Sequence, residues 1–143
     1  KDITEKPIRY KDLTKQTYIL ANYLNKNYIK TNISKPKDSI GLLLPNLNAT
    51  FLTFLAIQLV NLTPAMLNYS GGKKSILDAC TLAKIKVIIT HRTVVEKMKL
   101  EEVIKEIESH EIKVIYLDDI ITEIKSHKLK YGLTYKIKKQ IKI

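Results

Sequence analysis

The stretch PAMLNYSGGKKS, residues 64–75, holds residue types that bind phosphate in other proteins. Two adjacent glycines precede two lysines and a serine, and backbone N–H groups at a helix start favour an anion. A Walker A loop has glycine, four further residues, and then Gly-Lys-Ser/Thr. Here Lys74 stands between the first lysine and Ser75, and Leu67 occupies the position of the motif's first glycine. This spacing excludes a Walker A loop, and the stretch has no Gly-x-Gly-x-x-Gly dinucleotide motif either.

The glycines of this stretch have a structural interpretation that competes with anion binding. Gly71 and Gly72 allow a tight turn from a strand into a helix, and Ser70 is a suitable N-cap for that helix. The alternative is a general anion site at the helix N-terminus, to which Lys73 would contribute charge. We favour the turn, because the spacing of a specific phosphate motif is missing.

The histidines and the single cysteine do not have the spacing of metal ligands. The chain contains His91, His110 and His127, and Cys80 has no cysteine partner at ligand spacing. His91 directly follows an expected strand, which is where loops of open α/β sheets carry chemistry. We favour a solvated loop residue for His91 and a small core residue for Cys80.

Asp118 and Asp119 end another expected strand and have two possible roles. They could bind a cation, or they could cap the helix that follows, and we favour the cap. Ser70, His91 and Asp118 are the three residue types of a catalytic triad, but their positions in the sequence give no reason to expect convergence. We therefore assign no catalytic, cofactor-binding or metal-binding residue from these motifs.

The apolar pattern divides the chain into alternating helices and strands. Spacings of three and four residues predict helices, and short continuous apolar runs predict buried strands. The expected helices cover residues 10–28, 46 or 48–60, 70–85, 93–110 and 120–127, and the expected strands cover 39–44, 64–68, 86–90 and 113–117. We expect Asn46 or Asn48 to cap the second helix, which is apolar on most faces and should lie inside the protein.

This alternation predicts an α/β fold. Strands that alternate with helices of about 10–20 residues form βαβ units, which build a mostly parallel sheet with helices on both faces. A chain of 143 residues suits one compact domain or part of a larger one.

The amino-acid composition restricts the kinds of partner that the protein can bind and the compartment in which we expect it. The net charge is +11, but only two of the 25 basic residues are arginine, and the chain is rich in Ile and Asn. Because phosphate recognition usually draws on the forked guanidinium group, we attribute the charge to codon bias and expect no nucleic-acid partner. One cysteine, no secretory pattern and no apolar run of about 20 residues predict a cytoplasmic location.

The tail, residues 125–143, has a basic amphipathic pattern. It contains seven lysines, no acidic residue, and leucines and isoleucines spaced by four. One interpretation is a helix that binds a membrane surface. The other, which we favour, is a helix that packs against another domain.

The order of segments resembles the start of the acyl-adenylating (AMP-binding, acyl-CoA synthetase-like) superfamily. The shared pattern is an apolar strand that ends in Pro-Asn, a buried helix, Pro-x-x-x-Asn, a further helix, and Ala-Lys before the next strand. The residues that match this pattern are Ile40, Gly41, Pro45, Asn46, Pro64, Asn68, Ala83 and Lys84. The resemblance covers residues 10–140 and implies the N-terminal subdomain of such an enzyme.

Three segments are similar to one branch of that superfamily. PAMLNYSGG, IKVIITHR and IYLDDI resemble the synthetase part of bifunctional 2-acylglycerophosphoethanolamine acyltransferase/acyl-acyl carrier protein synthetases. That branch uses ATP and Mg²⁺ to adenylate a long-chain fatty acid and passes the acyl group to acyl carrier protein. Its acyltransferase domain then moves the group onto a lysophospholipid at the inner membrane.

The resemblance also implies what this chain lacks. The family's phosphate loop and its adenine, magnesium and catalytic lysine motifs would follow the last residue, and no His-x4-Asp acyltransferase pair is present. We therefore expect residues 1–143 to be a single partial domain that is inactive alone, with no cofactor of its own. Assembly with a separately encoded remainder of the enzyme is a further option, which we favour less. The alternative is a non-enzymatic module that binds lipid or a partner through its basic tail.

Overall fold

A four-stranded parallel sheet forms the centre of the computed structural model, which describes residues 7–31 and 35–127. The strand order is β2-β1-β3-β4, and every neighbouring pair is parallel. The strands are β1 (Ser39–Leu42), β2 (Thr63–Met66), β3 (Val87–Thr90) and β4 (Lys113–Tyr116). β1, β3 and β4 lie within the runs predicted as strands, and β2 overlaps the predicted strand 64–68 but begins one residue earlier, so the predicted α/β fold is confirmed.

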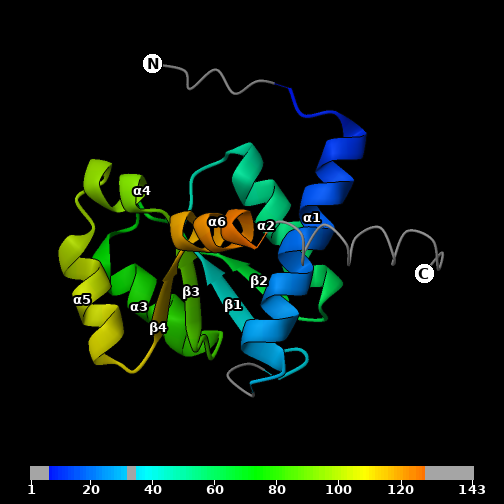
Figure 1. The fold of residues 1–143 in the computed structure, drawn as a ribbon. Coiled ribbons are helices and arrows are strands. Elements are labelled where there is room, and N and C mark those ends of the chain that lie inside the picture. Colours follow the sequence, from blue (N-terminus) through cyan, green and yellow to red (C-terminus); the bar gives the residue numbers. More distant parts are fainter. Residues whose placement is uncertain (1–6, 32–34, 128–143) are drawn as a thin grey trace.

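The helices alternate with the strands along the chain (Figure 1). They are α1 (Tyr10–Leu24), which continues as the π-helical turn η1 (Asn25–Ile29), α2 (Asn48–Leu59), α3 (Gly72–Leu82), α4 (Arg92–Lys97), α5 (Glu101–Ser109) and α6 (Leu117–Ser126). Helices α2 and α3 begin after β1 and β2, and α4 and α6 begin after β3 and β4. All four of these helix starts therefore lie at the carboxyl edge of the sheet.

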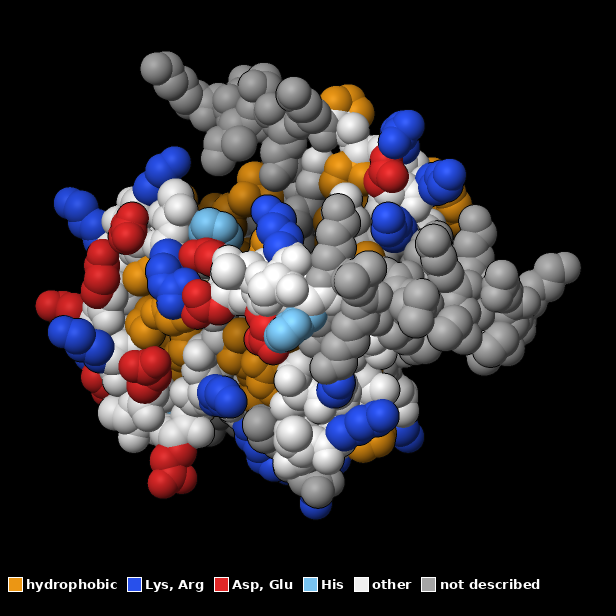
Figure 2. Space-filling model, viewed as in Figure 1, with side chains coloured by type: hydrophobic (Ala, Val, Ile, Leu, Met, Phe, Trp, Pro, Cys, Tyr) orange, Lys and Arg blue, Asp and Glu red, His pale blue; other side chains and the backbone are white. Residues whose placement is uncertain are grey.

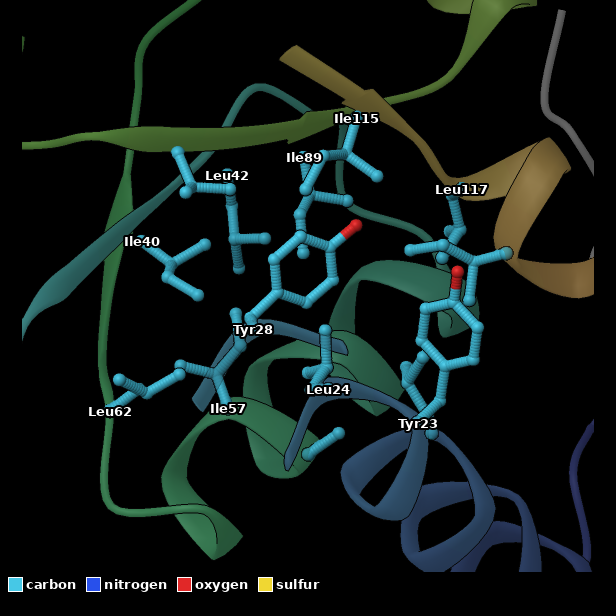
Figure 3. Packing of buried hydrophobic residues seen from close by; sticks show 14 of the residues in the cluster. Tyr23, Leu24, Tyr28, Ile40, Leu42, Ile57, Leu62, Ile89, Ile115 and Leu117 are labelled. Carbon is cyan, nitrogen blue, oxygen red and sulfur yellow. The ribbon is translucent and has the colours of Figure 1, made fainter. Parts of the chain in front are cut away.

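Two apolar clusters cover the two faces of the sheet. The larger cluster joins α1, η1, α2 and α6 to side chains such as Ile40, Leu42 and Ile89 (Figure 3). The smaller cluster joins α3, α4 and α5 to Leu43 and Ile88. Successive strand residues point to opposite faces, so one apolar run supplies both clusters. The expected placement of helices on both faces is confirmed.

The strand order follows from the faces that the crossover helices occupy. The chain leaves β1 through α2 on one face to reach β2, and then crosses back through α3 on the other face to reach β3. This exchange of faces keeps both parallel connections right-handed. It also places the topological switch point of the sheet, where the strand order reverses, between β1 and β3. Open α/β sheets bind ligands at such a point.

The helix predicted over residues 93–110 is wrong in its continuity, because the structure has two helices there. Lys99 has a φ of 53°, which turns the chain between α4 and α5, and Leu100 N–H donates to the carbonyl oxygen of Val95. Val95 of α4 and Val103 of α5, on either side of this turn, both lie in the smaller cluster.

Helix α2 is buried on one side only, which corrects the expectation that it lies inside the protein. Thr50 and Thr53 face the core, while Phe51 and Leu59 are 54% and 50% exposed. The threonine hydroxyls donate to backbone carbonyl oxygens of Pro45 and Ala49, at 2.6 and 2.7 Å, so their burial leaves no donor unsatisfied.

The expected cap of α2 is also corrected. Leu47 occupies the N-cap position, and no side chain caps the helix there. The hydroxyl of Thr50 reaches back to the Pro45 carbonyl instead, which fixes the strand end against the first turn of the helix.

Residues 128–143, most of the predicted basic tail, lie outside the described residues. Among the helices that the structure describes, none has the length and apolar character needed to cross a bilayer.

Candidate functional site

The carboxyl edge of the sheet brings together charged groups from the ends of β3 and β4. Arg92 makes a bidentate contact with Asp119, with N–O distances of 2.7 and 2.8 Å. The guanidinium group also lies 4.3 Å from the centroid of the Tyr116 ring. Bidentate pairs of this kind combine strong hydrogen bonds with a fixed geometry. Arg92 therefore links the loop after β3 to the start of α6.

His91 connects the same two loops. Its Nδ1 accepts a hydrogen bond from the backbone N–H of Thr93, at 3.2 Å, and so caps α4. The other ring nitrogen, Nε2, lies 3.0 Å from Oδ1 of Asp118. The other oxygen of Asp118 accepts from the backbone N–H of Arg92, at 3.2 Å. His91 was interpreted as a solvated loop residue, but it has a structural role between two helices.

The two aspartates do not make the cap that was predicted for them. They lie in the first turn of α6, whose N-cap is Tyr116, and no side chain caps this helix. Their charge still complements the positive end of the helix dipole. Their oxygens face Arg92 and His91, and the described residues contain no group of three potential metal ligands. The arrangement suits a structural ion-pair cluster better than a cation site.

The Arg92–Asp119 pair predicts a pH dependence. The hydrogen bond from Arg92 lowers the pKa of the Asp119 carboxyl below its ordinary value. Because the folded pKa is lowered, the pair stabilises the fold above the unfolded pKa of about 4, and this is lost as pH falls through the folded pKa. In an NMR titration, Arg92→Gln should raise the pKa of Asp119. Lys97→Gln, which removes a charge from the same helix, should leave it unchanged.

The glycine-rich loop is a turn and not a phosphate cradle. Asn68 Oδ1 accepts from both the backbone N–H and the hydroxyl of Ser70, at 3.0 and 2.6 Å. Gly72 has a φ of 79°, a conformation that favours glycine. Lys73 forms a salt bridge with Glu106 of α5, with its Nζ 2.8 Å from the carboxylate oxygen. The predicted turn is therefore present, but Gly71 and not Ser70 is the N-cap.

The three triad residue types do not form a triad. His91 and Asp118 are close, but the Ser70 hydroxyl is held by Asn68 in the loop after β2. Strand β1 lies between β2 and β3 in the sheet, so the loop that holds Ser70 and the loop that holds His91 do not follow neighbouring strands. Among the described residues, the Ser70 hydroxyl is therefore not placed to act as a nucleophile beside the histidine.

The remaining candidates have ordinary environments. Cys80 is buried in the smaller cluster, and burial raises the pKa of its thiol, which fits the predicted core role. His110 Nδ1 lies 2.8 Å from the carbonyl oxygen of Glu106 at the end of α5. His127 follows the last turn of α6.

Sequence reasoning missed Arg92 and Tyr116 as members of the ion-pair cluster. Tyr116 lies in the predicted strand 113–117, and Arg92 comes two residues after the predicted strand 86–90. Their proximity depends on β3 and β4 being neighbours, with Thr90 opposite Tyr116. The signal was the matched position of Arg and Asp just after two successive strands of a parallel sheet.

The comparisons with known proteins identify the class of this fold. An open parallel sheet with helices on both faces and its helix starts at one edge defines a doubly wound α/β protein. The family model described as "AMP-binding enzyme" matches residues 4–136. The chain belongs to this family of AMP-binding enzymes.

Solved structures share the fold at low sequence identity. The N-terminal subdomain of NpsA from Klebsiella oxytoca is 17% identical with a TM-score of 0.53, over 60% of this chain and 21% of that one. Apo MatB from Rhodopseudomonas palustris is 14% identical with a TM-score of 0.59, over 80% and 21%. The fatty acid AMP ligase from Legionella pneumophila is 17% identical with a TM-score of 0.56, over 83% and 20%. This chain therefore spans about one-fifth of the length of each.

The residues that carry the family resemblance shape the fold. A Cβ on Gly41 would lie 2.9 Å from side-chain atoms of Ile88 and Leu67, so this strand position has no room for one. Asn68 holds the turn before α3, and Lys84 ends that helix with a φ of 51°. Pro64 lies in edge strand β2 with its nitrogen away from β1, because Thr63 and Leu67 donate to β1 on the inner side.

Proposed function

We propose that this chain is the N-terminal part of an enzyme that adenylates a long-chain fatty acid and transfers the acyl group to acyl carrier protein. The observation that carries the proposal is the family match over residues 4–136, nearly the whole chain. The shared fold with a fatty acid AMP ligase supports the acyl substrate. The branch resemblance in PAMLNYSGG and IYLDDI supports a bifunctional enzyme of phospholipid acyl turnover, with a 2-acylglycerophosphoethanolamine acyltransferase as its other activity.

The described residues do not fit ATP or Mg²⁺. Lys73 is paired with Glu106, and the oxygens of Asp118 and Asp119 face His91 and Arg92. A magnesium ion would have to displace these partners, and a phosphate at the glycine turn would have to compete with Glu106 for Lys73. We therefore propose that the groups that bind and activate ATP belong to a following part of the enzyme, and that residues 1–143 are an inactive partial domain.

The proposed enzyme has partners of defined chemistry. They are ATP with Mg²⁺, a long-chain fatty acid, acyl carrier protein, a lysophospholipid and the remainder of the enzyme. The proposed location is the cytoplasm, with contact at the inner membrane surface, and no nucleic acid is involved.

An ATP–pyrophosphate exchange assay with palmitate tests the proposal. The 143-residue chain alone is expected to give the rate of a protein-free blank, because its described residues present no group placed to stabilise the transferring phosphoryl charge. The longer protein read in frame beyond Ile143 is expected to catalyse palmitate-dependent exchange and to load acyl carrier protein.

Benzoate and malonate are the matched control acids for the longer protein. Exchange with either acid, and none with palmitate, would contradict the fatty acid assignment. Exchange by the 143-residue chain above the blank would contradict its inactivity.

A further inference from the structure

The outward side of α2 is an apolar surface. Phe51, Leu55 and Leu59 repeat every four residues along it, and Gln58 is the polar residue among them. Helix α2 contains no charged residue, and its two core-facing threonines are buried while Phe51 and Leu59 are half exposed. A soluble helix normally has the opposite arrangement, so this side of α2 has the character of a binding surface.

Two shallow hollows flank this surface and widen it. One, of about 380 Å³, lies between α2 and the end of β2, and Phe51, Phe54 and Met66 supply its apolar lining. The other, of about 320 Å³, lies between α1 and α2, with Tyr10 and Tyr18 among its lining residues. We call α2 and the facing side of α1, with these hollows, the α1–α2 face.

Positive charge is concentrated on the same part of the molecule. The described residues of 7–66 contain seven Lys and Arg and only two Asp, whereas residues 67–127 contain ten basic and ten acidic residues. In Figure 2 the acidic side chains gather on the left, while Lys and Arg predominate over α1 on the right. Lys11 and Lys15 are exposed on α1, and neither forms a salt bridge within the described residues.

We propose that the α1–α2 face docks onto an anionic lipid bilayer, with Phe51, Leu55 and Leu59 at the level of the acyl chains. The lysines of α1 would contact the lipid headgroups. Interfacial binding scales with buried apolar area plus attraction to anionic lipid, and this face supplies both. A second copy of the chain is a poorer occupant, because it would bring two positively charged halves together. The proposal deepens, and rests on, the inner-membrane contact of the proposed function, but vesicle binding itself does not require adenylation.

The absence of tryptophan from the chain allows a direct test. Phe51→Trp places the single tryptophan of the chain on the α1–α2 face, where it can be excited selectively. Leu82→Trp places it on α3, across the sheet, at a position that is 85% exposed. The full chain is mixed at low salt with vesicles of phosphatidylcholine and phosphatidylglycerol, with or without brominated acyl chains. We expect a blue shift and bromine quenching for Trp at position 51 and neither at position 82.

Two further variants measure the contributions to binding. Phe51→Ser should lower the affinity for these vesicles, measured by co-sedimentation, roughly tenfold, because no aromatic side chain is then transferred from water into the bilayer. Lys11→Glu with Lys15→Glu should weaken it by at least about tenfold at low salt and by less at high salt. The four positions changed in the tryptophan, serine and charge variants (11, 15, 51 and 82) are exposed or half exposed, so the circular dichroism spectrum should be unchanged.

The results that overturn the proposal are distinct from failure of the enzyme assay. No vesicle binding, or binding that leaves Trp at position 51 unshifted, would overturn it and leave a protein partner as the occupant of the face. Equal quenching at positions 51 and 82 would also overturn it. Binding to pure phosphatidylcholine as strong as to the anionic mixture would refute the role of the lysines.

Discussion

Replacing Gly41 by valine is expected to destabilise the protein by about 3 kcal/mol. Gly41 lies in β1, the strand between β2 and β3, where a Cβ would lie 2.9 Å from atoms of Ile88 and Leu67. Valine adds two further methyl groups to this contact, so the smaller cluster or the strand spacing must give way. Urea unfolding followed by circular dichroism measures the loss.

The steric origin of this loss can be tested with a second substitution. Leu67→Ala removes one of the two atoms that a Cβ at position 41 would meet. The double variant should therefore lose less stability than the sum of the single variants, since contacting sites are coupled. A Gly41→Val protein as stable as the parent chain would show that β1 and β3 are not packed as described.

Ile57→Ala is expected to cost about 3 to 4 kcal/mol. Ile57 is fully buried on the core side of α2, where it belongs to the larger cluster with Leu24 and Ile40. The substitution removes three carbon atoms and leaves a cavity that surrounding side chains fill only in part. The same urea measurement applies.

Leu59→Ala is the matched control, because it removes the same three carbons from the same helix. Leu59 is 50% exposed, so its loss should cost about 1 kcal/mol or less. Equal costs at the two positions would contradict the orientation of α2, on which the membrane proposal also depends.

The strands could be predicted because each is a short apolar run with a polar or proline boundary. The order of the strands in the sheet could not be predicted, because an apolar run does not indicate which other strands are its neighbours. The side of α2 that faces the core could not be predicted from the sequence either. Apolar residues surround this helix, and the two threonines that face the core satisfy their hydroxyls on backbone carbonyls, so they are buried at little cost.

The ion-pair cluster was predictable only as separate parts. His91 and Asp118 were recognised as separate candidates because each directly follows a predicted strand. Arg92 was not, and its pairing with Asp119, 27 positions away, has no signature in the sequence. Only the adjacency of β3 and β4 makes these residues neighbours. The break at Lys99 was missed for a local reason, since lysine carries no turn signal of the kind that glycine or asparagine gives.

The orientation of Pro64 has a consequence for how copies of this protein behave at high concentration. Strand β2 forms an open edge of the sheet, and edge strands can recruit other chains into intermolecular ladders that nucleate aggregates. The proline nitrogen points to that open side and has no hydrogen to donate, so an incoming strand loses a bond at the middle of a four-residue segment. The residue that begins the family-like stretch PAMLN therefore also makes this edge of the sheet a poorer template for polymerisation.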